Sequence, residues 1–170
     1  RETMPPTICD VGPRDGLQNL PRHFSVAERA ELVESLAAAG VSHIEAVSFV
    51  NPKRVPQMAD AEGVLERLAL PSGVRLAGLV LNERGVERAV ATRLDEIRFV
   101  LVASESFGRR NQNASIADTV AGFERIAPTV HAAGKSLTGV VAVSFGCPFE
   151  GEVPVLTAAE IVERVVAAGA

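Results

Sequence analysis

Arg14 and Asp15 are neighbouring charged residues in a short segment whose composition favours a turn. The segment, VGPRDGLQN, covers residues 11–19 and contains one proline and two glycines, which favour turn geometry. A guanidinium is a planar fork of donors that suits a carboxylate, thioester or enolate oxygen, and a carboxylate offers hard oxygens to a divalent cation. A solvated ion pair on a surface loop is the alternative interpretation, and the surrounding turn favours ion binding.

The runs on either side of this turn predict the elements that position the two charges. Apolar, β-branched runs alternate with longer segments of helical periodicity along the whole chain. This alternation predicts consecutive β-α units, and therefore a parallel sheet whose strands are buried on both faces. The predicted strands are residues 7–9, 43–47, 75–80, 96–101 and 137–143.

Capping residues predict where the helices begin and end. The predicted amino-terminal caps are Ser25 and Thr157, each followed by a glutamate three residues later, together with Asn82 and Ser115. The tripeptide Ala-Ala-Gly recurs at residues 38–40, 132–134 and 167–169, where the glycine can take the left-handed conformation that ends a helix. Pro128 predicts a kink or break in the fourth helix near residue 127.

Composition excludes several classes of protein. With 47% hydrophobic residues, the 170-residue chain is long and apolar enough to bury the core of one domain. Its net charge of −4 argues against a nucleic-acid partner. It has no apolar run of about 18 residues and no apolar region near its amino terminus, so we expect no membrane partner, no signal peptide and a cytoplasmic location. The two cysteines, Cys9 and Cys147, are too few for a disulfide framework.

Five β-α units allow two architectures. One is a doubly wound sheet, but the first turn lacks the G-x-G-x-x-G pattern that binds a dinucleotide in such folds. The other is an incomplete (β/α)8 TIM barrel, because eight units of this length would need about 270 residues and a barrel typically has roughly 250.

Four motifs resemble the 3-hydroxy-3-methylglutaryl-CoA lyase family, within the metal-dependent acyl-CoA lyases and Claisen-condensing enzymes built on a β/α barrel. They are VGPRDGLQN at 11–19, IEAVSFVNPKRVPQM at 44–58, SESFGRRNQNASI at 104–116 and FGCPFEG at 145–151. The resemblance implies an α/β fold in which residues 1–170 are the amino-terminal portion of a single TIM-barrel lyase domain, about its first five β-α units. The family's His-x-His metal pair and catalytic cysteine loop would follow residue 170, so we expect this segment to be inactive by itself.

The resemblance also implies a reaction and roles for three residues. Lyases of this family deprotonate the tertiary hydroxyl of the acyl-CoA substrate and break a carbon–carbon bond, giving acetoacetate and the enolate of acetyl-CoA. Asp15 would be a ligand of the divalent cation, Mg²⁺ or Mn²⁺, and Arg14 would bind the substrate and stabilise the enolate oxygen. Glu45 would lie beside Arg14 as a catalytic residue that orients it or supports the ligands of the metal, or would be its charge partner only.

Weaker expectations concern the rest of the site. We expect Gln18 and Ser48 to contact the substrate, and Asn111 and Asn113 either to meet the CoA moiety or to shape their turn. The basic pairs at 53–54 and 109–110 could attract CoA phosphates. Cys147 belongs to an earlier segment than the family's catalytic cysteine loop, so we expect no catalytic role for it. None of the three histidines has metal-binding spacing with another.

The resemblance implies a homodimer that acts on an acyl-CoA in leucine catabolism and ketone-body formation. Arg54 replaces a tryptophan found in many relatives, and Leu20 begins a stretch that differs from theirs, so the preferred acyl group stays open. A condensing enzyme of the isopropylmalate or homocitrate synthase type is an alternative, although such enzymes usually have Asp-Thr-x-Arg-Asp-Gly at the first turn. A non-catalytic, stand-alone α/β module is the other alternative.

Overall fold

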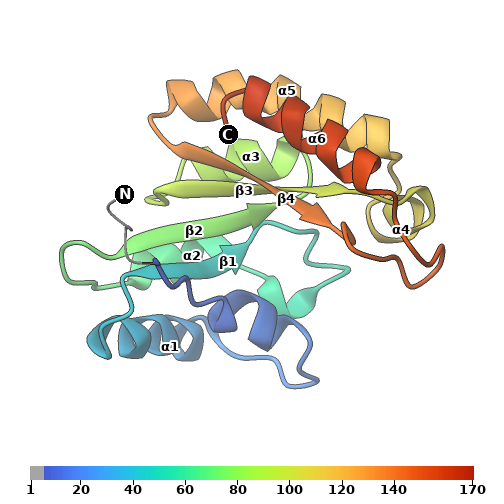
Figure 1. Cartoon of the computed structure of the whole chain (residues 1–170). Helices are drawn as coiled ribbons and strands as arrows, with labels where there is room; N and C mark the ends of the chain where they lie inside the picture. Colours follow the sequence, from blue (N-terminus) through green and yellow to red (C-terminus); the bar gives the residue numbers. More distant parts are fainter. Residues whose placement is uncertain (1–5) are drawn as a thin grey trace.

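The computed structural model describes residues 6–170, in which four parallel strands alternate with helices (Figure 1). The strands are β1 (His43–Ser48), β2 (Arg75–Val80), β3 (Glu96–Val102) and β4 (Ser136–Ala142). Each lies within one residue of its predicted bounds. The residues on which the signal-peptide expectation depends lie mostly outside the described residues. Among the described residues, no helix is both long and apolar enough to cross a bilayer.

The strand predicted at residues 7–9 is absent. Only Asp10 bridges in parallel to Ile44, donating its N–H to the carbonyl of His43 and accepting from the N–H of Glu45. Ile8 is 78% exposed, so the segment buries too little apolar surface to form a regular strand beside β1. This short contact nevertheless sets where the Arg14–Asp15 turn meets the sheet.

The strand order distinguishes between the two architectures left open by the sequence. The order is β1-β2-β3-β4, with each strand hydrogen-bonded in parallel to the next in the chain. A doubly wound sheet reverses its strand order, whereas a β/α barrel adds each strand beside the previous one. The chain is therefore part of a β/α barrel, as predicted, with four strands and not five in the described sheet.

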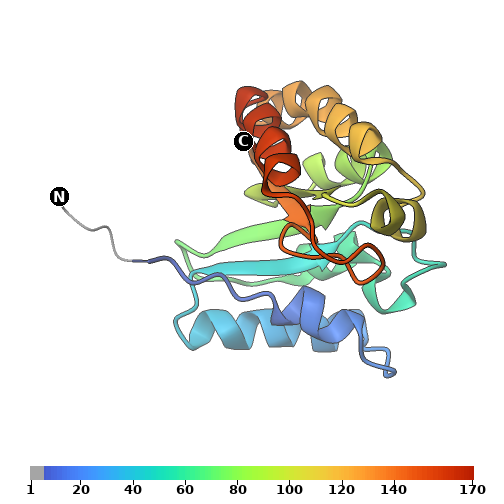
Figure 2. The same ribbon diagram turned by 45° about the vertical axis from the view of Figure 1, so that its right-hand side comes forward.

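The helices form a row that follows the curve of the sheet. Figure 2 shows α1 and α6 at opposite ends of this row. The helices are α1 (Val26–Ala38), α2 (Ala61–Arg67), α3 (Glu83–Val90), α4 (Glu105–Asn111), α5 (Ile116–Ala132) and α6 (Val155–Ala167). A short π-helical turn, η1 (Gly12–Gly16), and a 3-10 turn, η2 (Pro56–Met58), complete the elements.

Most of the predicted caps are present. Ser25 and Ser115 form capping boxes, Asn82 accepts a hydrogen bond from the N–H of Gly85, and the glycine of each Ala-Ala-Gly tail has a positive φ. The cap predicted at Thr157 is wrong, because α6 begins earlier and its amino-terminal cap is Pro154. The N–H of Thr157 already bonds the carbonyl of Pro154, so Thr157 lies within the first turn.

The predicted break at Pro128 is also wrong, since α5 continues through this residue to Ala132. Proline removes one backbone donor from a helix. Buried residues on both sides of it, Phe123 and Val130, hold the helix against the core, and the Phe123 ring packs edge-on against Phe99 at 5.9 Å. Apolar packing therefore outweighs the lost hydrogen bond.

The two faces of the sheet differ in chemistry. Side chains such as Leu76, Ile97 and Leu101 point toward the helices and belong to the apolar core. Alternate residues on the same strands, including Glu96 and Arg98, point to the other face. This inner face carries a layer of charged side chains, and beyond it, toward the carboxyl ends of the strands, lies an open cavity.

Candidate functional site

The turn that carries Arg14 is helical, whereas the sequence predicted a glycine-dependent turn. Neither Gly12 nor Gly16 has a positive φ. Gly12 lies close to Asp10 instead: its N–H donates to the Asp10 carboxylate at 2.8 Å, and an added Cβ would lie 3.0 Å from the same oxygen. The N–H groups of Arg14 and Asp15 both bond the carbonyl of Val11. These bonds fix η1 just beyond the Asp10 bridge.

Arg14 is held by two carboxylates. Its Nε donates to Oε1 of Glu45, and one Nη donates to Oδ1 of Asp15 at 2.8 Å. The Arg14 side chain is 15% exposed and that of Asp15 is 55% exposed, whereas Glu45 is 2% exposed. The structure thus brings together the three residues to which the resemblance assigned the chemistry. The second Nη of Arg14 donates to no described residue.

Arg98, which the sequence motifs did not predict as a site residue, lies on the other side of Glu45. Its Nη1 donates to Oε2 of Glu45 at 3.0 Å, and its Nε donates to Oε1 of Glu96 at 2.7 Å. Its Nη2 donates to the Cys9 sulfur at 3.3 Å. The signal was present in β3, where charged Glu96 and Arg98 alternate with apolar residues at the period of a strand that faces two environments.

Glu96 joins these contacts to β4 and makes a second connection to β1. It accepts a hydrogen bond from the Thr138 hydroxyl at 3.0 Å, and its other oxygen lies 3.0 Å from Nε2 of His43. Burial raises the pKa of Glu96, but hydrogen bonding and charge from Arg98, with smaller effects of Thr138 and His43, bring that pKa below its usual value. Burial lowers the pKa of Arg98, but Glu96 more than offsets this effect and the pKa is raised. Both groups are therefore charged at neutral pH.

A cavity of about 860 Å³ lies above this charged layer. Polar groups at its mouth include three of the predicted site residues, Arg14, Asp15 and Gln18, as well as the predicted Asn111 and Asn113. Apolar side chains of the strand ends, Leu79, Val100 and Val140 among them, line the wall. A concavity of this size, lined by both apolar side chains and convergent polar groups, has the dimensions of a small-molecule site.

The two predicted substrate contacts have different surroundings. Gln18 lines the cavity, and its Oε1 accepts no hydrogen bond from a described residue. Ser48 is buried at the end of β1, and its Oγ has no described hydrogen-bond partner. Ser48 does not line the cavity, so its role as a substrate contact stays a prediction.

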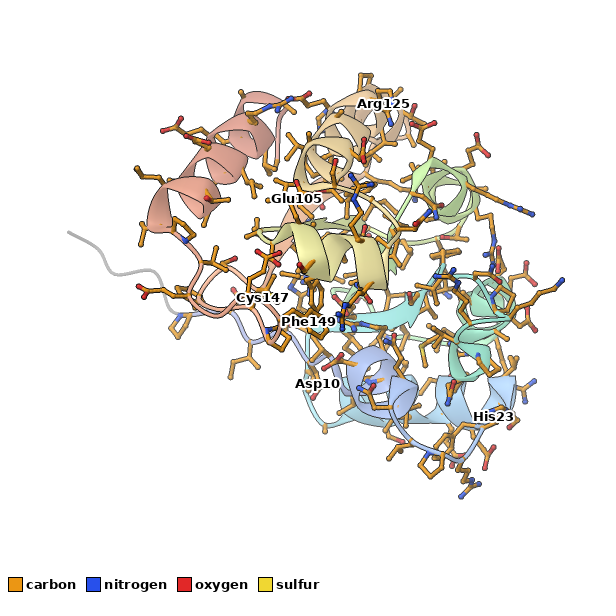
Figure 3. The ribbon with its side chains drawn as sticks, turned by 90° about the vertical axis from the view of Figure 1, so that its right-hand side faces the viewer. Asp10, His23, Glu105, Arg125, Cys147 and Phe149 are labelled. Carbon is orange, nitrogen blue, oxygen red and sulfur yellow. The ribbon has the colours of Figure 1, made fainter. Side chains whose placement is uncertain are left out.

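Cys147 fastens the loop after β4 to α4. It is buried, its sulfur accepts from the Ser104 hydroxyl at 2.9 Å, and its N–H and carbonyl both bond Gly151. In Figure 3, Cys147 and Phe149 lie in this loop beside α4. Burial raises the pKa of the Cys147 thiol, but hydrogen bonds from Ser104 and from the backbone N–H groups of Phe149 and Glu150 outweigh this effect and lower it. These contacts indicate a structural role.

The described residues fit a divalent cation only in part. Asp15 offers an exposed carboxylate at the cavity mouth, and Gln18 adds an amide oxygen, both of which are hard ligands. Glu45 is occupied by two arginines. Within residues 6–170 no three His, Cys, Asp or Glu side chains gather into a metal site. Asp15 is therefore suited to be one ligand of a set that these residues do not complete.

Comparisons with known proteins agree with this geometry. The HMGL-like family model matches residues 5–170. A hydroxymethylglutaryl-CoA lyase of Pseudomonas mevalonii is 41% identical over 161 residues, covering 93% of this chain and 52% of that protein. An (R)-citramalyl-CoA lyase of Chloroflexus aurantiacus is also 41% identical, covering 96% of this chain and 55% of that protein.

A solved structure extends the likeness to three dimensions. It is an HMG-CoA lyase from Acinetobacter baumannii in complex with coenzyme A and 3-methylmalate, 34% identical to this chain with a TM-score of 0.91. The match covers 95% of this chain and 52% of the solved one. The chain thus spans about half the length of the relatives that it matches.

Proposed function

Because the chain belongs to the HMGL-like family, we propose that residues 1–170 supply the amino-terminal portion of a single β/α-barrel lyase domain. The reaction we propose is cleavage of 3-hydroxy-3-methylglutaryl-CoA, or a close 3-hydroxyacyl-CoA, to acetyl-CoA and acetoacetate. The observation that carries the proposal is the fixed guanidinium of Arg14 at the cavity mouth, held by Glu45 and Asp15.

Cleavage of the carbon–carbon bond moves negative charge onto the thioester oxygen, and Arg14 is placed to receive it. A preoriented donor stabilises such charge better than water does, because it needs no reorganisation during the reaction. Glu45 holds Nε of Arg14, which leaves the second Nη for the substrate. We assign Gln18 to a substrate contact, because its amide oxygen lines the same cavity without a described partner.

Asp15 would hold the divalent cation, Mg²⁺ or Mn²⁺, as one of its ligands. When bound, that ion supplies Lewis-acid chemistry, which lowers the pKa of the substrate hydroxyl. The remaining ligands, the dimeric assembly and the cytoplasmic location are parts of the same proposal. A pair of carboxylates that holds Arg14 serves a condensing enzyme equally well, but the three relatives named above are lyases, which favours cleavage.

The proposal leaves open which acyl group the enzyme prefers. Relatives with two different acyl-CoA substrates are equally similar to this chain, so sequence identity does not choose between them.

A substrate panel tests the function. The polypeptide that completes the barrel should be assayed with 3-hydroxy-3-methylglutaryl-CoA, citramalyl-CoA and a 3-hydroxyacyl-CoA without a tertiary hydroxyl. We expect cleavage of at least one tertiary substrate, loss of activity with a chelator and recovery when Mg²⁺ or Mn²⁺ is added back. Activity that survives chelation would remove the metal from the proposal, and no cleavage of any thioester would favour a non-catalytic module.

A further inference from the structure

Arg98 is a charged residue on the inner face of β3 that none of the chemistry above uses. Its side chain is 14% exposed, and a buried guanidinium is costly unless its donors are paired. Every one of its nitrogens has a partner: Nε bonds Glu96, Nη1 bonds Glu45 and Nη2 bonds Cys9. A side chain that is fixed so completely has little freedom to move.

Arg98 and Arg14 both bind the carboxylate of Glu45. Glu45 gives Oε1 to Arg14 and Oε2 to Arg98, so its two oxygens are bound from opposite sides. With Arg14 alone, the Glu45 carboxylate could rotate about its last side-chain bond and carry the guanidinium with it. Binding of Oε2 removes that rotation, because both oxygens are then fixed.

The hold on Arg98 extends across the sheet. Glu96 receives Nε of Arg98 at 2.7 Å and is itself fixed by Thr138 on β4 and by His43 on β1. A continuous series of contacts therefore connects β4 to η1, through Glu96, Arg98 and Glu45 to Arg14. Such a network resists displacement more than one exposed ion pair does.

We propose that Arg98 is a positioning residue that sets the orientation of Arg14 through Glu45. The proposal rests on the proposed function, in which Arg14 is the donor to the thioester oxygen. Arg98 itself touches neither the substrate nor the cation. Its loss should therefore disturb the chemical step and leave binding of the CoA portion nearly unchanged.

Three variants of the polypeptide that completes the barrel test this role. Arg98→Leu should lower kcat roughly tenfold to a hundredfold with KM changed less than about threefold, since small misplacements of reacting groups have effects of this size. Arg98→Lys should recover part of kcat, because an ammonium keeps the charge without the fork that reaches both glutamates. Arg75→Leu is the matched control: Arg75 is 3.6 Å from Glu96 and half-exposed, and it makes no contact with Glu45.

A double variant distinguishes a loss of Arg14 positioning from a general loss of packing. In an Arg14→Lys background, Arg98→Leu should reduce kcat little further if it acts only through Arg14, whereas loss of overall packing would reduce both backgrounds equally. Should Arg98→Leu fail to fold, the charge-balanced pair Glu96→Gln with Arg98→Met gives the same comparison. An unchanged kcat in a folded Arg98 variant would overturn the proposal, and so would equal losses in both backgrounds.

A crystal structure of an Arg98 variant tests the positioning role of Arg98 even if the wild type cleaves no thioester. In that case the proposed function fails, while the positioning role is still tested. We expect the Arg14 side chain to leave its wild-type orientation or to occupy more than one. An Arg14 guanidinium that stays on Glu45 in a single conformation would contradict the proposal.

Discussion

At the scale of single residues, the proposed function depends on Arg14 and Asp15. Arg14→Gln removes the donor to the developing oxyanion and should reduce kcat/KM by about 10²–10³, the range measured for loss of one such donor. Asp15→Ala should reduce it at least as much, and raise the Mg²⁺ concentration needed for half-maximal activity. Steady-state kinetics of the barrel-completing polypeptide would measure both effects.

Arg22→Gln is the matched control for these variants. Arg22 lies in the loop that follows η1, but it is exposed, pairs with Glu28 at the start of α1 and lies over the Phe24 ring, away from the cavity lining. Exposed ion pairs contribute little to stability, so this variant should keep wild-type kinetics. If Arg14→Gln were as active as Arg22→Gln, the role assigned to Arg14 would be wrong.

The sequence predicted some of the site residues and not others. The motif led to Arg14 and Asp15 and associated Glu45 with them, because its residues were recognisable without any contact information. It did not lead to Arg98, because a single sequence does not show which charged strand residues face the barrel interior and which face water. It also could not show that Ser48 is buried and absent from the cavity lining, although it pairs with Leu79, which lines the cavity.

At the scale of elements, Ser104 connects α4 to the loop after β4. Its hydroxyl oxygen accepts from the N–H of Phe107 as the cap of α4, and its hydrogen is donated to Cys147. Ser104→Ala should reduce the free energy of unfolding by about 1–2 kcal/mol, the usual effect of losing such a cap. It should also raise the pKa of the Cys147 thiol, because a hydrogen bond that lowers this pKa is removed.

Urea unfolding measures the first effect, and the pH dependence of alkylation of Cys147 measures the second, with Cys9→Ser as background. Thr157→Ala is the matched control, because Thr157 has the sequence context of a cap but lies inside α6. A loss of stability from Thr157→Ala equal to that from Ser104→Ala would contradict the capping argument. An unchanged alkylation profile in Ser104→Ala would contradict the contact with Cys147.

Element boundaries were predictable where local chemistry decides them. Ser25 and Ser115 cap helices as expected, because each has its acidic partner three residues later and no competing start. Thr157 has the same pattern, but α6 begins earlier, with Pro154 as its amino-terminal cap. Capping preferences alone did not predict this earlier start. The strand expected at residues 7–9 is absent because strand formation depends on a neighbour, and only the Asp10 bridge is made.

At the scale of the whole molecule, the sequence left two architectures open, because both are built from alternating strands and helices. Strand order distinguishes them, and it is a non-local property that periodicity does not encode. The resemblance favoured the barrel, and the sequential order β1-β2-β3-β4 confirms part of one. In a part of a barrel, an edge strand and the helix beside it keep surfaces that the next unit would cover.

Such a surface lies at the β4 edge. Among the described residues β4 pairs only with β3, and α6 exposes four large apolar side chains, with Leu156 at 75% exposure. These four are Val155, Leu156, Val162 and Val166. Apolar patches beside an unpaired strand edge favour association.

The 170-residue polypeptide, purified by itself, should therefore self-associate, with a weight-average mass that rises with concentration in sedimentation equilibrium. Replacing two of the exposed residues, as in Leu156→Glu with Val166→Glu, should shift it toward monomer, because charge opposes burial of that face. Glu163→Gln on the same helix is the control, since it leaves the apolar side chains in place. A stable wild-type monomer at all concentrations would show that this face needs no cover, and would weaken the proposal that these residues belong to a larger barrel.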